Sequence, residues 1–452
     1  MKRLPIPIAM AVAAILSPMS VMAELSTTAP SQIPNQNPAT LSGDFVDIDS
    51  KDKLEQEPAT ISPPVTEAVD NSLTFSGYAR MGAGFTDTDP GSELYEGSIQ
   101  NGQNIIRTAG SQYQATGRLG NEGHGLEFGL NKRFDHAKGH WDVFIMVDDN
   151  YGSGSNWNDG DDKLKIAQAF AGGNGVFAAQ PDAYVWAGKR FNGREHVDLN
   201  DYFWFMNDGN GGGVDDLDFG FAKFDFSVVA GDNGNNGRYA LTTKLHSITI
   251  TENASVRFLA NYGFGSANEV ENDDGLLEDV KDSYQLGAIY HQSFANGWSE
   301  FGARYNDGAR NQLLGGNGKD GDGMALTAQG EFELSSTWEL AYALIYEKNG
   351  MEDEDQTWSQ AVVRPGYRWN DYLSTWLDVA YDQVEFDGKG TNSSWKATVS
   401  QNFGLGSFLG SRPQVRVFAT YGELDTEYVG DSGAKQGKDS ATTIGIMFDA
   451  WW

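Results

Sequence analysis

The sequence predicts an all-β fold, a transmembrane antiparallel β-barrel, and three observations lead to it. The first is the last ten residues, TIGIMFDAWW, in which Ile444, Ile446, Phe448 and Ala450 alternate with a second set of side chains. A period of two is the signature of a strand with two different faces. The chain then stops on Trp452, and an aromatic residue at this point suits the interfacial girdle of an outer-membrane barrel.

The second observation is the beginning of the chain. Residues 1–23 start with Lys2 and Arg3, continue through a short apolar stretch and finish in small residues, as a secretory signal peptide does. A membrane anchor is the alternative, which the three prolines of this segment disfavour. No later segment approaches the roughly 18–20 apolar residues of a spanning helix, so an exported chain would cross a membrane only as a closed barrel.

The third observation is a series of alternating runs after Leu73, separated by loops rich in Gly, Asp and Asn. They are LTFSGYARMGAGF (73–85), SYQLGAIYH (283–291), LTAQGEFEL (326–334), WELAYALIYE (338–347), STWLDVAYDQ (374–383) and VRVFATYGE (415–423). At about 20 residues for a strand with its loop, residues 73–452 hold about 16 to 18 strands, and we expect 18. A soluble β-sandwich or propeller is the alternative. It is disfavoured because the apolar residues face one way and leave no second set to build a core.

The segment between the signal peptide and the barrel, residues 24–72, is dominated by Pro, Ser, Thr, Gln and Asn. It has no lasting apolar periodicity, so we expect a disordered periplasmic extension. A short coiled coil over residues 41–54 is the alternative, and it would break at Pro58. An even number of strands returns the chain to its starting side, which places both barrel termini in the periplasm.

Composition excludes several classes of function. A formal net charge of −31 argues against a nucleic-acid partner. The chain has no cysteine, which excludes disulfides and thiolate metal sites. Its six histidines are scattered, and no nucleophile elbow, Walker loop or HExxH motif occurs. We therefore expect no enzyme activity, no catalytic residues, no metal site and no cofactor.

Most aromatic residues lie on the lipid-facing side of the alternation, where the membrane explains them. Three share the water-facing side with charged residues instead: Tyr78 with Arg80, Trp298 with Glu300 and Arg304, and Trp451 with Asp449. A sugar needs this combination, because its C–H face stacks on a ring while its hydroxyls bond to charged groups. The alternative is that these rings merely fill the wall.

Several blocks of the sequence resemble the maltoporin family of carbohydrate-specific porins. They are SGYARMGAGF (76–85), GRLGNEGHGLEFGL (117–130), WAGKRFNGREHVDLNDYFWF (186–205), VDDLDFGFAKF (214–224), SRPQVRVFATYG (411–422) and the terminal WW. The resemblance implies a homotrimeric 18-stranded outer-membrane barrel. In that family an aromatic slide in the lumen guides oligosaccharides past a polar constriction, which an infolded loop forms.

Carried over by position, the resemblance implies a site. The slide would comprise Tyr78 near the periplasmic end, Trp298 and Trp451 deeper in the wall, and Trp157 reaching in from a neighbouring subunit. The polar constriction would comprise Arg80, Arg118, Glu127, Arg194, His196, Asp198 and Asp201, with Phe203 at the usual place of a constriction tyrosine.

The sequence also departs from the family pattern. The slide tyrosine expected just before Glu127 is missing, with Gly125 or Leu126 there, and Gly410 replaces a slide tryptophan. The loop disulfide of the family is absent. The resemblance thus implies a sugar-selective diffusion porin for maltodextrin-like or other oligosaccharides, in contact with outer-membrane lipid and lipopolysaccharide. A general diffusion porin with little sugar affinity is the alternative.

Overall fold

The computed structural model describes residues 72–86, 99–100, 103–104, 106–111, 116–149, 164–231, 237–266, 269–271, 277–279, 282–314, 320–351, 355–405, 412–429 and 436–452. The expected signal peptide, the extension up to residue 71, Trp157 and Gly410 lie outside these residues. The described part of the chain contains no helix that is long and apolar enough to span a membrane.

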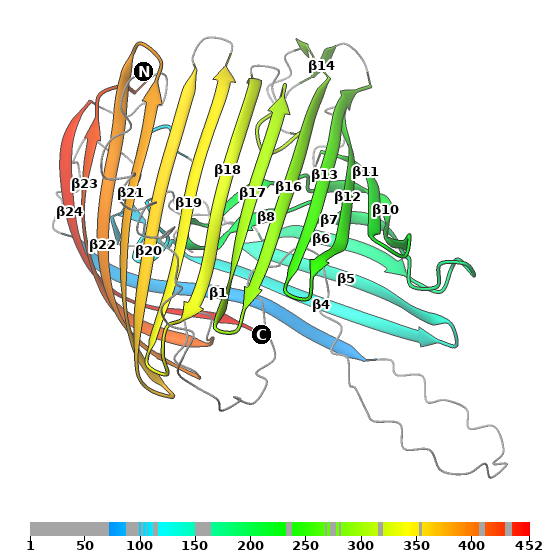
Figure 1. Ribbon diagram of the computed structural model, residues 1–452, viewed down its shortest axis with the longest axis horizontal. Helices are drawn as coiled ribbons and strands as arrows, with labels where there is room; N and C mark the ends of the chain where they lie inside the picture. The colour runs from blue at the N-terminus through cyan, green and yellow to red at the C-terminus, as the bar shows by residue number, and fades with distance from the viewer. Residues whose placement is uncertain are drawn as a thin grey trace. The chain divides into compact units, whose positions relative to one another are not determined.

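Eighteen strands form one closed antiparallel sheet, as predicted (Figure 1). They are β1 (Leu73–Thr86), β4 (Gly125–His136), β5 (Gly139–Asp149), β6 (Lys165–Gly173), β7 (Tyr184–Arg190), β10 (Gly209–Asp218), β11 (Lys223–Ala230), β12 (Arg238–Thr251), β13 (Ala254–Gly265), β16 (Ser283–Phe294), β17 (Gly297–Asp307), β18 (Asp320–Glu333), β19 (Trp338–Met351), β20 (Gln356–Asn370), β21 (Leu373–Phe386), β22 (Gly390–Gly404), β23 (Gln414–Thr426) and β24 (Gly437–Trp451). Short hairpins β2 (Ile99–Gln100) with β3 (Gln103–Asn104), β8 (Glu195–Val197) with β9 (Tyr202–Phe205), and β14 (Glu269–Glu271) with β15 (Leu277–Asp279) lie in the connections.

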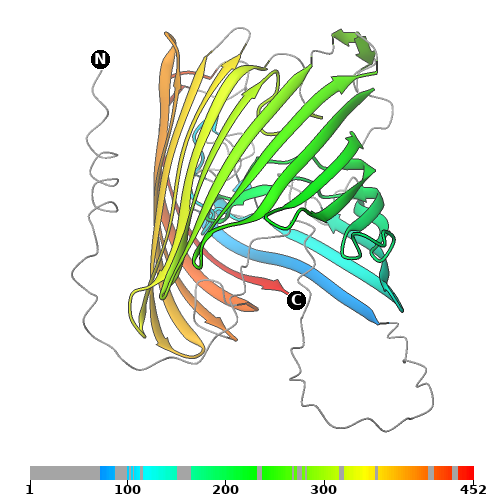
Figure 2. The same cartoon turned by 45° about the vertical axis from the view of Figure 1, so that its right-hand side comes forward.

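The barrel closes where β1 pairs with β24. Tyr78 lies opposite Trp451 and Arg80 lies opposite Asp449 in this antiparallel seam. Figure 2 shows β1, in blue, close to the red end of the chain. Since the strands alternate in direction, Leu73 and Trp451 lie at the same end of the barrel, which we call the terminal end. The opposite end is the loop end. The closed sheet excludes the sandwich and propeller alternatives.

The two faces of the wall follow the predicted alternation. In β24 the side chains of Ile444, Ile446 and Phe448 are exposed on the outside, whereas Met447 and Asp449 between them are buried on the inside. The pleat of a strand sends successive side chains to opposite faces. The outward apolar band and the inward polar face of a membrane barrel are therefore both present.

A long connection between β7 and β10, residues 191–208, folds into the barrel. Tyr202, Trp204 and Phe205 of this infolded loop are fully buried and pack against inward apolar residues of the wall, including Trp358 and Trp376. The loop contacts β1 through Arg80 on one side and β16 through the cluster around Ile289 on the other. These strands lie on nearly opposite sides of the sheet order, so the loop crosses the lumen and narrows it.

The described residues of a second connection, 106–111 and 116–124, also lie inside, which the sequence did not predict. Asn392 of β22 donates to the Ala109 carbonyl at 3.0 Å, and Thr398 donates to the Leu119 carbonyl at 3.0 Å. The Arg118 amide donates to the Leu199 carbonyl at 2.7 Å and so ties this segment to the infolded loop. The expectation that no second set of apolar side chains faces inward is therefore wrong. Such a set exists on the wall, and the two inward connections bury it.

Two wall glycines make room for the rings of the infolded loop. A Cβ at Gly287 would come within 2.6 Å of Phe205 Cζ, and a Cβ at Gly302 would collide with the Trp204 indole. Both glycines face inward on β16 and β17. The close approach of ring to backbone thus requires glycine at these positions.

We expect Gly302→Val to displace the infolded loop, because overpacking a filled site costs about 1–3 kcal/mol. Single-channel recordings should show larger or noisier conductance than the parent. Ala303→Val is the matched control, since Ala303 points outward on the same strand. Identical traces from Gly302→Val and the parent would show that Trp204 does not hold the loop.

Candidate functional site

The centre of the candidate site is an aromatic pair at the seam between β1 and β24. The Tyr78 and Trp451 rings stack with centroids 6.4 Å apart and planes 28° apart. Their strands place them opposite each other in register, so they lie at one height near the terminal end. The expectation that Trp451 lies deeper than Tyr78 is wrong, because antiparallel pairing brings residue 451 back to the level of residue 78.

Three guanidinium groups lie against this aromatic pair, and the Cζ of the first, Arg80, is 5.9 Å from the Tyr78 ring centroid. Arg118 Cζ lies 5.7 Å from the Tyr78 ring centroid and its Nη2 donates to the Tyr78 hydroxyl at 2.6 Å. Arg412 Cζ lies 4.4 Å from the Trp451 ring centroid. A cation over a ring is held by the ring quadrupole. Hydrogen-bond donors therefore stand at the hydroxyl edge of Tyr78 and over the Trp451 indole, beside the ring surface that is left uncovered.

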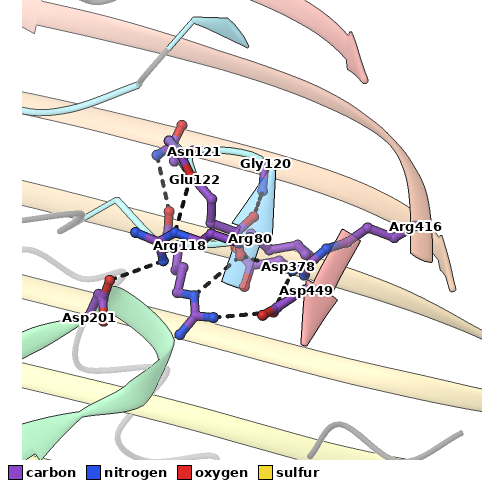
Figure 3. Close-up of polar contacts among 12 residues, drawn as sticks. Arg80, Arg118, Gly120, Asn121, Glu122, Asp201, Asp378, Arg416 and Asp449 are labelled. Atoms are coloured by element: carbon purple, nitrogen blue, oxygen red, sulfur yellow. Dashed lines mark hydrogen bonds and ion pairs between the residues drawn. The ribbon is translucent and has the colours of Figure 1, made fainter. Parts of the chain in front are cut away.

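Asp449 organises the arginines beside the pair, a group that we call the arginine cluster: Arg118, Arg412 and Arg416. Figure 3 shows Asp449 with two of them, Arg118 and Arg416. The Asp449 Oδ2 atom is 3.3 Å from Arg118 Nη2, 2.9 Å from Arg412 Nη2 and 2.7 Å from Arg416 Nη2. Glu122 adds a second carboxylate, 3.3 Å from both Arg118 Nε and Arg416 Nη2. Three cations thus share two buried carboxylates, which leaves a local positive excess in an acidic chain.

Asn121 links Ile106 to the turn that carries Arg118 and so holds Arg118 in place. The Asn121 amide donates to the carbonyls of Ile106 and Gly117, and its oxygen accepts from the Ile106 amide at 3.0 Å. Glu122 also accepts from the Gly120 amide at 3.2 Å. These bonds satisfy the backbone of a buried connection. They fix the orientation of the guanidinium toward Tyr78.

A chain of charged contacts continues from the wall into the infolded loop. Arg80 Nη1 lies 3.2 Å from Asp201 Oδ2, and Asp201 Oδ1 lies 3.3 Å from His196 Nε2. The other imidazole nitrogen, Nδ1, lies 2.8 Å from Asp198 Oδ1. Burial alone would lower the pKa of His196, but the hydrogen bonds to both carboxylates outweigh it and raise the pKa to about 9. His196 is therefore an imidazolium at neutral pH.

This charge state predicts a pH-dependent ion selectivity. The pKa of His196 lies above the ordinary 6.5, so its charge and the stability of its two ion pairs are fully present below pH 6.5 and are lost as pH rises through about 9. Reversal potentials should therefore move toward cation selectivity as pH rises from about 8 to 10. His196→Gln should lack this step. A parent and a variant with the same pH profile would contradict the assignment.

Phe203 lies at the end of the line of charged contacts that runs from Arg80 through Asp201 to His196. Its ring stacks on the His196 imidazole at 4.3 Å and 25°, and Arg194 Cζ lies 4.8 Å from its centroid. Arg194 is held by both oxygens of Asp208, with Nε at 2.9 Å from each. Bidentate hydrogen bonding of this kind fixes the orientation of the planar guanidinium group. Phe203 therefore offers a ring between two cationic groups in the narrowed part of the lumen.

Glu127 lies beside Tyr78 across the β1–β4 pairing. It is nearly buried, and within the described part of the chain its Oε2 atom has no hydrogen-bond partner. A buried acceptor without a partner costs free energy that a bound hydroxyl would recover. Gly125, on the same inward face, leaves the place of the missing slide tyrosine without a ring.

Trp298 stands apart from the Tyr78–Trp451 pair. It is the second residue of β17, immediately after a turn at the terminal end, and its ring stacks on His291 at 5.9 Å and 21°. The predicted deeper position of Trp298 is therefore wrong. A second charged line runs from it: Glu300 lies 2.9 Å from Arg257, which lies 2.5 Å from Glu195 of the infolded loop.

The structure thus brings together most of the predicted residues: Tyr78, Arg80, Arg118, Glu127, Arg194, His196, Asp198, Asp201, Phe203 and Trp451. It leaves Trp298 on a separate line. Sequence reasoning missed Glu122, Arg412 and Arg416 as partners of the site. Inward parity could have found Arg416, as it found Asp449 and Glu300. Glu122 and Arg412 lie in connections, where parity gives no signal.

The fold and the narrowed, polar lumen define a porin, a channel-forming protein that crosses the bacterial outer membrane many times. The comparisons with known proteins name the family. Residues 73–452 match the LamB porin family, and the chain belongs to it. A relative named Maltoporin, from Vibrio cholerae serotype O1 El Tor Inaba, is 29% identical over 434 residues, covering 87% of this chain and 97% of its own.

Two further similarities were found. The Maltoporin of the classical Ogawa strain of Vibrio cholerae serotype O1 is also 29% identical, covering 87% of this chain and 96% of its own. The solved structure of Acinetobacter baumannii OccAB1 aligns with a TM-score of 0.48 at 10% identity, covering 84% of this chain and 96% of that one. The family assignment rests on the sequence match.

Proposed function

We propose that this porin is sugar-selective and carries oligosaccharides across the outer membrane by facilitated diffusion. The observation that carries the proposal is the stacked Tyr78–Trp451 pair, with Arg118 at the Tyr78 hydroxyl, Arg412 over the indole and Glu127 beside the pair. A pyranose would lay its C–H face on the rings and direct its hydroxyls at these groups. Two relatives named Maltoporin support the same class of substrate.

In this proposal the sugar moves from ring to ring along charged neighbours. The line through Arg80, Asp201 and His196 leads to Phe203 in the infolded loop. Trp298 would supply a second stacking surface at the terminal end, which we assign to the periplasmic side. Each binding position consists of one aromatic ring and adjacent ionic groups. The sugar hydroxyls can therefore pass from one set of hydrogen-bond partners to the next without losing solvation.

A general diffusion porin is the second candidate, and one observation favours it. Gly125 leaves the inward face beside Glu127 without a ring, and no contact joins Trp298 to the Tyr78–Trp451 pair among the described residues. An interrupted series of rings would hold sugars weakly. The scaffold alone would then act as an acidic diffusion pore.

Planar-bilayer conductance separates the two candidates. Maltodextrins, sucrose and β-glucosides are added to a conducting bilayer, one at a time, at increasing concentration. We expect saturable block of the ion current by at least one of these sugars. A current that all three leave unaffected would overturn the sugar-selective proposal and support the general porin.

We also propose that the protein is a homotrimer, because the sequence resemblance to the maltoporin family implies this assembly. The outward apolar band would then contact neighbouring subunits as well as lipid and lipopolysaccharide, and Trp157 would reach a neighbour's channel. Native mass measurement in mild detergent should give a trimer. A monomer under these conditions would contradict the proposal.

A further inference from the structure

Three side chains on the inner wall, outside the aromatic and arginine groups, point their ligand atoms at one another. They are Asp216 of β10, Asp225 of β11 and His246 of β12. His246 Nε2 lies 3.0 Å from Asp225 Oδ1 and 3.7 Å from Asp216 Oδ1, and all the ligand atoms lie within 4.8 Å of one another. We call them the Asp-Asp-His group.

Two irregularities in the wall create this group. The register of β10 against β11 shifts between Val214 and Leu217, and Asp216 has a positive φ of 60°. Asp215 already faces inward, since it accepts from the buried Trp186 indole at 3.2 Å. The bulge therefore turns a second successive side chain, Asp216, to the same face. A similar shift follows Leu245, where Ser247 has φ 58°.

Ser247 orients the imidazole. Its hydroxyl lies 3.0 Å from His246 Nδ1, on the side away from the carboxylates. When Nδ1 donates a proton to this hydroxyl, the Nε2 lone pair is left facing Asp225 and Asp216. In the metal-free protein a proton on Nε2 fills this place, in the hydrogen bond from His246 to Asp225 Oδ1 at 3.0 Å, and a metal ion would replace that proton. Metal-binding histidines are commonly fixed by such a bond from their other nitrogen.

The spacing suits a transition-metal ion. A four-coordinate ion with bonds of about 2.1 Å holds its ligand atoms about 3.4 Å apart, between the two observed separations. The three ligands stand on neighbouring strands of a closed sheet, so little rearrangement is needed. An imidazole with two carboxylates favours Zn²⁺ over Ca²⁺, which prefers oxygen ligands alone.

We propose that the Asp-Asp-His group binds a divalent transition-metal ion on the lumenal wall, with Zn²⁺ as the representative ion. The Lys223 ammonium competes with the metal ion for the Asp216 carboxylate, because it lies 3.0 Å from Asp216 Oδ1. Its side chain is partly exposed and can move into the lumen when a metal arrives. The sequence could not reveal this site, because its members lie 9 and 21 residues apart with no motif spacing.

Calorimetric titration of the purified, EDTA-treated porin with Zn²⁺ alone tests the proposal. We expect one ion per chain in the parent and weaker binding of Ca²⁺. His246→Gln and Asp225→Asn should each weaken Zn²⁺ binding by about tenfold or more, at least the loss seen when a residue that only hydrogen-bonds to a metal ligand is removed. Lys223→Met should tighten it several-fold, because it removes the competing cation.

His140→Gln is the matched control. Its Nε2 lies 3.1 Å from Asp142 Oδ2, the same kind of pair, but the described residues give it no third ligand. It should bind Zn²⁺ like the parent. Each variant is first checked for the heat-dependent gel migration of a folded barrel. Zn²⁺ binding that His246→Gln leaves intact, equal binding of Ca²⁺ and Zn²⁺, or no binding by parent and Lys223→Met would overturn the proposal.

Discussion

We expect Trp451→Ala to weaken sugar block of the channel about 2- to 12-fold while ion conductance changes little. The indole is the larger ring of the stacked pair, and aromatic contacts of this kind contribute about 0.5–1.5 kcal/mol beyond buried area. Trp298→Ala should also weaken sugar block. Its effect should be independent of that of Trp451→Ala, because Trp298 stacks on His291 and lies apart from the Tyr78–Trp451 pair. The measurement is the concentration of sugar that halves the current.

Trp395→Ala is the matched control for this prediction. Trp395 faces outward on β22, so the same truncation removes no lumenal surface. Sugar should block this variant at the same concentration as it blocks the parent. If Trp451→Ala and Trp298→Ala also bind sugar like the parent while their conductance changes, these rings only fill the wall.

The second large effect concerns Asp449. We expect Asp449→Asn to destabilise the barrel by about 3–5 kcal/mol, because it leaves buried arginines without their shared carboxylate. Arg416 is almost fully buried, and among the carboxylates of the described residues it would keep Glu122 alone, at 3.3 Å. The lost negative charge should also move ion selectivity toward anions. Thermal unfolding in detergent and reversal potentials measure the two effects.

Asp425→Asn is the control for charge alone. Asp425 pairs with Lys438 at 2.7 Å at the loop end, where the Lys438 side chain is 80% exposed. Solvent screens such pairs, so this variant should unfold like the parent. A similar unfolding temperature for Asp449→Asn would show that Asp449 does not organise the arginine cluster.

Local alternation carried most of the fold prediction. The period of two placed Ile444 and Phe448 outside and Asp449 inside, because each strand of a barrel meets lipid on one face and water on the other. Strand number followed from chain length. The same parity put Tyr78, Trp298 and Trp451 on the inner face, and the structure agrees.

The alternation of side chains along a strand could not predict the level of a residue along the barrel axis, nor the path of the connections between strands. Trp451 was expected deeper than Tyr78, but which residues face each other depends on closure between the first and last strands. Residues 106–111 and 116–124 carry no periodicity, so the sequence could not predict that they pack against β22 or that they contribute Glu122 to the site. The group of Asp216, Asp225 and His246 needs bulges whose positions are set by the sheet.

A structure of the porin with an oligosaccharide that blocks the current would show directly whether the Trp451–Tyr78 pair binds sugar. We expect one sugar ring lying flat on this pair, with hydroxyls bonded to Arg118 and Glu127. A blocking sugar bound away from both rings, with the pair uncovered, would contradict it.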